Sequence, residues 1–368
     1  MVRFDKSLLN KSLRLAAAFS VLALFINPLA AQMGAPPSPE LAKFDRILGS
    51  WKGEGSVFMA AGQDAGMPWT GTSRFTKVLN GYFIREDTTI DLGGGQQIAM
   101  LAFYGWDERL KNFVQYSTSS MGGTYVAPLD WVSANKFVAM NSMRAMNPMT
   151  GKVERAVERW ATTFGEGDKS YEILGEKAVD GDAWFHHVTG KFTKSAEDVS
   201  AVDANAKAMM PPAEEMQRLE KMRGLYDVKG SMRWGPGEDE AMPIKGTERM
   251  DMIFGGQVLS MRTIGEPAGD MPADAQYEGL SYIGWDAVDK SYSLIMVSNM
   301  GEMAHLKMYA SDNDYVMIHT SVENGITMVK RSVLHCDDNG KATKVVTDQM
   351  NGSSPAFVSF EATYKIRD

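Results

Sequence analysis

The sequence is poor in the side chains that most often carry chemistry. Cys336 is the single cysteine among 368 residues, so no intrachain disulfide and no cysteine zinc cluster can form. The five histidines show no i, i+4 or His-x-His spacing, and His186 and His187 are expected to face opposite sides of a strand. Serine-elbow, phosphate-loop and HExxH motifs are missing. The sequence therefore predicts no catalytic residue, no metal site and no cofactor, and it favours a binding protein over an enzyme.

Basic residues are also scarce relative to acidic ones. The whole chain has a formal charge of −8, and residues 1–31 hold four basic residues and one acidic residue, which is +3. The remainder therefore carries −8 − 3 = −11. Nucleic acids and anionic membranes attract basic surfaces, so this acidity argues against both as partners.

Long apolar runs are missing beyond the N-terminus. The run from Leu15 to Ile26 has 26 − 15 + 1 = 12 residues, which suits a secretory signal and is shorter than the roughly 20 residues of a membrane span. Basic residues precede it, and small residues follow up to Ala31. We predict a signal peptide over residues 1–31, cleavage after Ala31, and a periplasmic or secreted protein with no stable membrane span after cleavage. An uncleaved anchor is the alternative.

What the sequence does contain is a repeat. Gly49 and Gly224 are 224 − 49 = 175 residues apart, and Gly71-Thr72-Ser73-Arg74 matches Gly246-Thr247-Glu248-Arg249 at the same offset. Further on, Gly105-Trp106-Asp107 matches Gly284-Trp285-Asp286 at 284 − 105 = 179. The second copy therefore has four extra residues, which we place between Gly265 and Ala275. Such fixed offsets predict a tandem duplication, with copies at 36–195 and 211–368 and a flexible linker at 196–210.

Each copy begins with a short helical pattern and continues with strands. Many short runs alternate between apolar and polar residues, Asn80-Gly81 is a hairpin signal, and no helical pattern separates the runs. Eight to ten strands per copy are enough to close a barrel without edges. We predict an all-β protein with two tandem antiparallel barrels, each preceded by a short helix. The helical stripes are Leu41, Phe44, Ile47 and Leu48 before Gly49, and Met216, Leu219 and Met222 before Gly224.

Several motifs of the first copy resemble the DUF1579 family. They are Leu-Gly-Ser-Trp-Lys-Gly-Glu-Gly (48–55), Leu-Asn-Gly-Tyr-Phe-Ile-Arg-Glu (79–86), Tyr-Gly-Trp-Asp (104–107), Ser-Ser-Met-Gly-Gly-Thr (119–124) and Asn-Pro-Met-Thr-Gly-Lys (147–152). The second copy is more divergent, with Tyr226 in place of the tryptophan and Gly255-Gly256 in place of Asn-Gly. The resemblance implies a calycin, or lipocalin-like, barrel. It implies no reaction, because the family has no assigned function.

Two pairs of equivalent residues are candidates for the ends of the barrels. Trp51 and Tyr226 open the first strand of each copy, where a large aromatic side chain typically plugs a calycin barrel. Arg74 and Arg249 open the second strand. They can either clamp an anionic ligand through bidentate bonds, or stack on the plug and bond carbonyl groups at the barrel end. We favour the second reading, which predicts buried arginines.

The remaining candidates are weaker. Trp106-Asp107 and Trp285-Asp286 end a strand in both copies, where an aspartate caps a turn or lines a cavity mouth. Tyr116 is a further candidate for ligand contact. Clustered methionines in both copies favour core filling, with a lipid or aromatic pocket as the alternative and copper capture as a third reading.

These observations lead to three hypotheses of function. The first is a binding protein that holds a small apolar or amphipathic ligand inside a lipocalin-like barrel. The second is a structural or interaction module whose barrels are filled with side chains. The third is an enzyme or a haem-binding barrel of the nitrobindin type, since the Gly-x-Trp opening also occurs in such barrels. An open pocket of about 300 Å³ or more would favour ligand binding.

Overall fold

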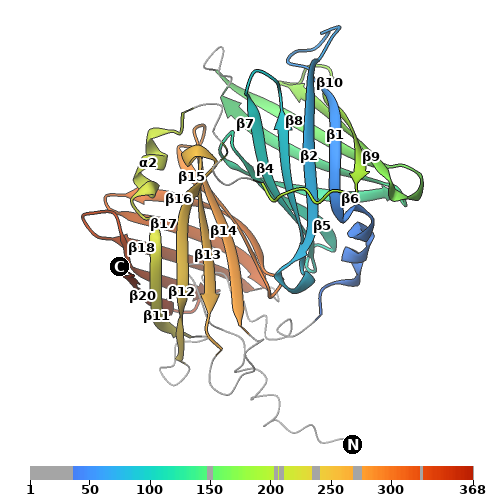
Figure 1. The fold of residues 1–368 in the computed structure, drawn as a ribbon. Coiled ribbons are helices and arrows are strands. Elements are labelled where there is room, and N and C mark those ends of the chain that lie inside the picture. The colour runs from blue at the N-terminus through green and yellow to red at the C-terminus, as the bar shows by residue number, and fades with distance from the viewer. Residues whose placement is uncertain are drawn as a thin grey trace, which may run out of the picture.

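Two closed antiparallel barrels of ten strands each make up the computed structural model (Figure 1). It describes residues 36–146, 152–202, 206, 211–233, 241–267, 276–323 and 326–367. The predicted signal peptide, the turn at 147–151 and part of the linker lie outside the described residues. Within the described ranges, no helix has the length and hydropathy needed to cross a membrane.

The strands run up and down in both barrels. Each strand pairs with its neighbours in sequence, and the first strand pairs with the last, which closes the sheet. The first barrel consists of β1 (Gly49–Val57), β2 (Met67–Val78), β3 (Phe83–Asp91), β4 (Gln97–Asp107), β5 (Asn112–Ser119), β6 (Thr124–Ser133), β7 (Lys136–Met146), β8 (Val153–Phe164), β9 (Ser170–Val179) and β10 (Phe185–Ser195). The second consists of β11 (Gly224–Met232), β12 (Met242–Ile253), β13 (Val258–Gly265), β14 (Tyr277–Asp286), β15 (Ser291–Ser298), β16 (Met303–Ser311), β17 (Asp314–Glu323), β18 (Ile326–Cys336), β19 (Ala342–Asn351) and β20 (Phe357–Ile366).

The short elements keep the same plan in both copies. Three-residue 3₁₀ turns η4 (Leu79–Gly81) and η7 (Phe254–Gly256) connect β2 to β3 and β12 to β13. Another, η5 (Glu166–Asp168), connects β8 to β9. The change of offset from 175 to 179 falls between β13 and β14, where the four extra residues were predicted.

A short helix covers one end of each barrel. It is a 3₁₀ helix in the first copy, η3 (Pro39–Ile47), and an α-helix in the second, α2 (Glu214–Glu220). The apolar residues of η3 recur every three positions, which aligns them in a 3₁₀ helix. The predicted plug residues are bonded to these segments: Trp51 Nε1 donates to the Ile47 carbonyl oxygen at 2.7 Å, and the Tyr226 hydroxyl donates to the Met222 carbonyl oxygen at 2.6 Å.

Different side chains fill the two barrels. Aromatic residues dominate the first core, where the Tyr171 and Phe192 rings stack at 4.7 Å and Trp69 lies against Phe192 at 5.6 Å. A Cβ atom on Gly53 would lie 2.5 Å from the Phe192 ring, so this glycine leaves room for it against the wall. The core-filling reading of the methionines holds in the second copy and is wrong in the first, where Met121 and Met140 are exposed. The methionines of the second core are Met216, Met222, Met232, Met250, Met261, Met296, Met308 and Met317.

The barrels share a third apolar cluster between their outer faces. At its centre the Phe103 and Tyr282 rings, which are equivalent residues, lie 5.7 Å apart. A Cβ atom on Gly284 would lie 2.8 Å from the backbone of Gly123, so the two sheets approach closely. Contacts recur reciprocally, since Gly301 faces Tyr82 and the equivalent Gly122 faces Gln257, which indicates a pseudo-twofold relation. The cluster comprises Leu79, Phe83, Ala99, Leu101, Phe103, Val114, Tyr116, Phe254, Val258, Tyr282, Ile295 and Val297.

Candidate functional site

Arg74 and Arg249 lie on the outer faces of their barrels, so the prediction that they stack on the plugs is wrong. Side chains alternate along a strand, and the burial of Phe75 in the core turns Arg74 outward. Arg74 Nε lies 3.7 Å from an Asp198 carboxylate oxygen, and Arg249 Nε lies 2.6 Å from an Asp251 carboxylate oxygen. Most of the Arg249 side chain, 67%, is exposed.

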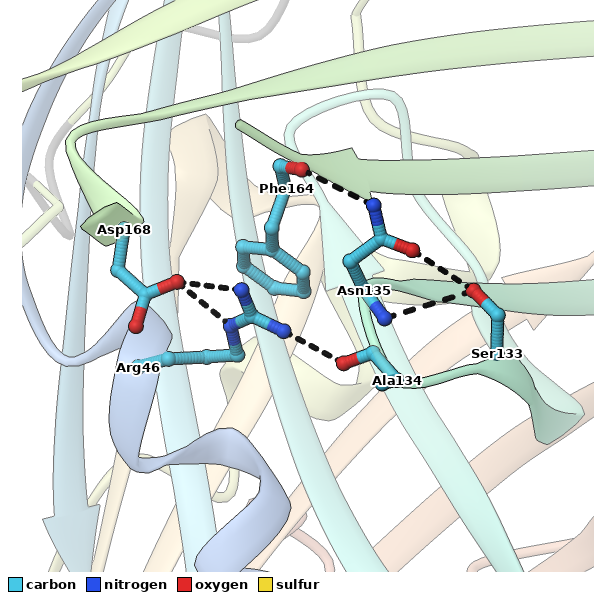
Figure 2. A network of polar contacts seen from close by, with 6 residues as sticks. All are labelled: Arg46, Ser133, Ala134, Asn135, Phe164 and Asp168. Atoms are coloured by element: carbon cyan, nitrogen blue, oxygen red, sulfur yellow. Dashed lines mark hydrogen bonds and ion pairs between the residues drawn. The ribbon is translucent and has the colours of Figure 1, made fainter. Parts of the chain in front are cut away.

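Arg46, which sequence reasoning missed, bonds a barrel-end carbonyl group as expected of Arg74, but it stacks on Phe164 and not on Trp51 (Figure 2). Its guanidinium carbon lies 4.3 Å from the centre of the Phe164 ring, and its Nη1 donates to the Ala134 carbonyl oxygen at 2.6 Å. Its Nε donates to Asp168 at 2.9 Å. Next to Ala134, Asn135 Nδ2 donates to the Phe164 carbonyl oxygen at 3.5 Å. Together these contacts form one polar network that joins η3 to the barrel end. An arginine does anchor this end, but it comes from the helix.

The two Trp-Asp motifs lie at strand ends and cap turns. Asp107 accepts hydrogen bonds from the next backbone N–H groups, those of Arg109 and Leu110, both at 2.9 Å. Asp286 does the same for two N–H groups of its own turn, at 2.9 and 3.0 Å. The partly buried Trp106 and Trp285 pack against the core of their own barrel. These contacts account for all four residues.

Two other residues from the sequence analysis have clear positions. Tyr116 belongs to the apolar cluster between the barrels and does not point into a barrel. His187 packs edge-on against Trp160 with ring centres 4.9 Å apart, and burial lowers its pKa. His186 is exposed and lies 3.7 Å from Glu176. The two histidines therefore separate as alternation predicted.

Each barrel also contains a buried carboxyl group that sequence reasoning missed. Glu86 accepts hydrogen bonds from the hydroxyl groups of Tyr104 at 2.5 Å, Thr88 at 2.7 Å and Ser73 at 3.2 Å. Burial raises its pKa, and all three hydroxyl donors favour its charged form. This carboxyl group is fully paired, so it is a structural element of the first barrel.

The buried carboxyl group of the second barrel belongs to Glu248. In the repeat, Glu248 is equivalent to Ser73 and not to Glu86. It is completely buried and accepts one hydrogen bond, from the Thr263 hydroxyl at 2.8 Å. Its Oε1 atom has no hydrogen-bond partner among the described residues. Burial raises its pKa to about 7. The sequence contained a signal for the burial of Glu248. Side chains alternate along a strand, so Glu248 faces the same side as Met250, two residues later.

A cleft of about 260 Å³ lies between the two barrels. We call it the inter-barrel cleft. Apolar side chains from both copies form much of its wall, and polar side chains, including three arginines, complete it. Its lining residues are Arg85, Leu101, Val202, Arg249, Asp251, Ile253, Phe254, Ser260, Arg262, Leu280 and Tyr282. Arg249 is the one candidate ligand-binding residue from the sequence analysis that lines it.

Each of the three arginines already has a carboxylate neighbour. Arg85 Nη2 donates to Asp87 at 2.7 Å, and its Nε is buried with no hydrogen-bond partner among the described residues. Arg262 Nε donates to Glu278 at 2.8 Å. Since a guanidinium has five N–H donors, several donors remain unused around the cleft. The sequence held a signal for this site, since Asp87 and Arg262 are equivalent at the offset of 175 and carry opposite charges.

The linker runs along the first barrel and reaches the inter-barrel cleft. The Ser50 hydroxyl accepts a hydrogen bond from the Val199 N–H at 2.9 Å, and the Val202 N–H donates to Asp87 at 3.2 Å. Val202 itself lines the cleft. The described part of the predicted flexible linker is therefore attached to the protein surface.

Comparisons with known proteins identify a family and little else. The model of the family described as "Protein of unknown function (DUF1579)" matches residues 36–193 and again 211–363. No curated protein matches the chain. A solved protein of unknown function from the DUF3598 family of Nostoc punctiforme is 12% identical, with a TM-score of 0.26, and the match covers 90% of this chain and 100% of that one. A Bacteroides fragilis protein described as a "putative outer membrane protein" is 10% identical, with a TM-score of 0.20 and coverage of 89% and 99%. TM-scores this low do not establish a shared fold.

Proposed function

The chain belongs to the DUF1579 family, whose function is unknown, and we propose from its geometry that it binds a small amphipathic ligand in the inter-barrel cleft. One observation carries the proposal, namely a hollow of about 260 Å³ that combines an apolar wall with a few polar side chains. Ligand sites have this composition and occur often at domain interfaces. The volume is slightly below the roughly 300 Å³ typical of drug-sized ligands, so it suits a small molecule.

The inter-barrel cleft is a better candidate than the barrel interiors, where the ligand was first expected. In the first barrel, Trp69, Tyr171 and Phe192 pack against one another across the interior wall. In the second, methionines and tyrosines occupy the corresponding space. The partly buried Ile253 and Leu280, by contrast, line a hollow, and covering such apolar surface is favourable by roughly 25 cal/mol per Å².

A second candidate function follows from the same packing. Barrels filled with side chains fit a structural or interaction module, which needs no ligand. The two candidates differ in what the cleft does, because an interaction module would leave small amphiphiles unbound. One titration therefore separates them.

The test is calorimetric titration of the purified protein with 1-octanol and with octanoate. We expect at least one of them to bind with a dissociation constant of about 0.05–1 mM, as befits ligands of so few atoms. Leu280→Trp, which fills the cleft, should abolish binding. Leu174→Trp is the matched control, because Leu174 lies on β9 and is not among the cleft residues. Equal binding by both variants, or no binding by the wild type, would contradict the proposal.

Export completes the proposed function. The basic start, the short apolar run and the small residues before Gln32 support a periplasmic or secreted protein. N-terminal sequencing of protein recovered from its native source should begin near Gln32. A chain that starts at Met1 and stays with the membrane would disprove export.

A further inference from the structure

Resting on the proposed function, we infer that the ligand carries an anionic head group, such as a carboxylate, sulfonate or phosphate ester, held by Arg249, Arg262 and Arg85. These residues come from both barrels, since Arg85 lies on β3 and the others on β12 and β13. All three line the one cleft, and Asp251 is the single carboxylate among the lining residues.

The strongest support is the pairing of two like charges. Arg249 and Arg262 are directly opposite each other in the register of β12 and β13. Like charges at opposite positions of neighbouring strands are unfavourable. Each arginine also has a carboxylate neighbour, Asp251 for Arg249 and Glu278 for Arg262. An anion between them would interact favourably with both.

The first copy of the repeat is an internal control for this pairing. The residue equivalent to Arg249 is Arg74, and the residue equivalent to Arg262 is Asp87. Arg74 and Asp87 are likewise directly opposite in β2 and β3, so the same place in the first barrel holds one positive and one negative charge. The second copy therefore differs from the first by a charge reversal, and it does so where the cleft lies.

The first copy also shows an anion meeting the equivalent arginine. Arg74 Nε lies 3.7 Å from a carboxylate oxygen of Asp198, which belongs to the linker and not to the barrel. In the second copy the carboxylate beside Arg249 is that of Asp251 on the same strand, and among the described residues no linker carboxylate forms an ion pair with Arg249. A ligand carboxylate beside Arg249 would repeat the arrangement seen at Arg74.

Unused donors are available for such a head group. Arg249 bonds Asp251 through Nε, which leaves its two terminal nitrogens. Arg85 has a buried Nε without a hydrogen-bond partner among the described residues, and a buried donor of this kind is unfavourable unless something accepts from it. Asp87 is 4% exposed and already accepts from Arg85 and from the Val202 N–H. It is therefore poorly placed to compete with a ligand.

The experiment compares three probes with one tail: octanoate, 1-octanol and octylammonium, titrated at pH 7.5. We expect octanoate to bind about ten-fold more tightly than octanol, which corresponds to one charge-assisted hydrogen bond, and octylammonium to bind least. The preference for octanoate should decline as salt is raised, whereas octanol binding should not.

Three variants test the residues. Arg249→Gln and Arg262→Gln should each remove the preference for octanoate over octanol. Arg262→Asp, which restores the charge pattern of the first copy, should favour octylammonium. Arg331→Gln is the matched control, because Arg331 is also an exposed arginine near a carboxylate, 3.8 Å from Asp348, but on β18 away from the cleft.

The outcomes separate the two proposals. If octanol binds the wild type as tightly as octanoate, or if the preference persists in Arg262→Gln, the anionic head group is disproved while the ligand site stands. If none of the three probes binds, the proposed function fails and this inference fails with it. Thermal melts of each variant confirm folding, which is expected because both glutamine substitutions replace mostly exposed side chains.

Discussion

The two barrels share one strand plan and one plug bond, yet different chemistry fills them. Rings such as Trp51, Tyr171 and Phe192 pack the first barrel, and methionines take much of their place in the second. The plug bond survives the change from tryptophan to tyrosine, because an indole N–H and a phenol O–H both donate to the same carbonyl position. The comparison shows that the alternation of inward and outward residues specifies this fold, while the identity of the core residues varies.

The two barrels also differ in how they accommodate a buried carboxyl group. The same chemical group is well hydrogen-bonded in the first barrel and poorly hydrogen-bonded in the second. Three hydroxyl groups donate to Glu86, whereas Glu248 receives a single hydrogen bond and keeps one unpaired oxygen. A buried charge is tolerated where donors surround it and is costly where they do not. The second barrel therefore contains a destabilising group that the first barrel does not.

The largest effect should come from removing either predicted plug residue. Trp51→Ala and Tyr226→Ala should each lower the free energy of unfolding by about 3–5 kcal/mol, because both side chains are completely buried. Since the barrels share an apolar cluster, we expect each variant to show one unfolding transition in denaturant followed by circular dichroism. Two separate transitions, of which only one moves, would show that the barrels unfold independently.

The pH dependence of stability should distinguish the two carboxyl groups. The pKa of Glu248 is about 7 in the folded state and near 4.5 in the unfolded state, so folding is not penalised below pH 4.5 and loses stability as the pH rises to 7 and above. Glu248→Met should therefore gain up to about 3 kcal/mol at pH 8 and nothing at pH 4. Urea titrations across this range measure the gain.

Glu86→Met supplies the contrast to that variant. It should lower stability, because the hydroxyl groups of Tyr104, Thr88 and Ser73 would lose their acceptor, at about 1–3 kcal/mol for an unpaired buried group. A gain in Glu248→Met that is the same at every pH would contradict an origin in ionisation.

Adding a single methyl group at the contact between the barrels should lower the free energy of unfolding. Gly284→Ala would place a Cβ atom 2.8 Å from the Gly123 backbone, and we expect it to cost about 1–3 kcal/mol. The equivalent Gly105→Ala would meet the side chains of Phe83 and Met303, which can move more easily than backbone. Denaturant melts should rank Gly284→Ala as the more harmful of the two. The reverse order would mean that the sheets separate readily.

The smallest effects should be found at three arginines: Arg46, Arg74 and Arg249. Arg46→Met should lower stability by about 1–2 kcal/mol, because the Ala134 carbonyl oxygen and Asp168 would lose a donor. Arg74→Met and Arg249→Met should leave the thermal midpoint unchanged, since exposed ion pairs contribute little. A clear drop for Arg74→Met without ligand would restore the stacking interpretation, which the outward position of Arg74 opposes.

Much of the fold could be predicted from local and repeated patterns. The offsets of glycines such as Gly49 and Gly224 indicated the duplication, and the alternation within strands indicated closed sheets. The helix before each barrel was expected, although the exact spacing of Leu41, Phe44 and Ile47 was needed to recognise a 3₁₀ form. These features depend on neighbouring residues, which is why one sequence suffices.

The site could not be predicted in the same way. Arg46 contacts Ala134 and Asp168, which are 88 and 122 residues away, and no local pattern encodes such contacts. The inter-barrel cleft depends on how two separate sheets pack, and strand alternation does not specify that packing. The reversal from Asp87 to Arg262 was visible in the sequence, but only the structure shows that it faces a hollow.

The attached linker affects how many ligand molecules one chain is expected to bind. Two identical barrels around a twofold axis would present equivalent recesses, one beside each copy of the repeated arginine. Asp198 lies beside Arg74, and the Val202 N–H donates to Asp87, so the connecting chain runs over the pair of residues that is equivalent to Arg249 and Arg262. Arg249 pairs with Asp251 of its own strand and lines the inter-barrel cleft, which Val202 borders. The single linker therefore makes the two copies of the repeat unequal. We expect one chain, although it contains two barrels, to bind one ligand molecule.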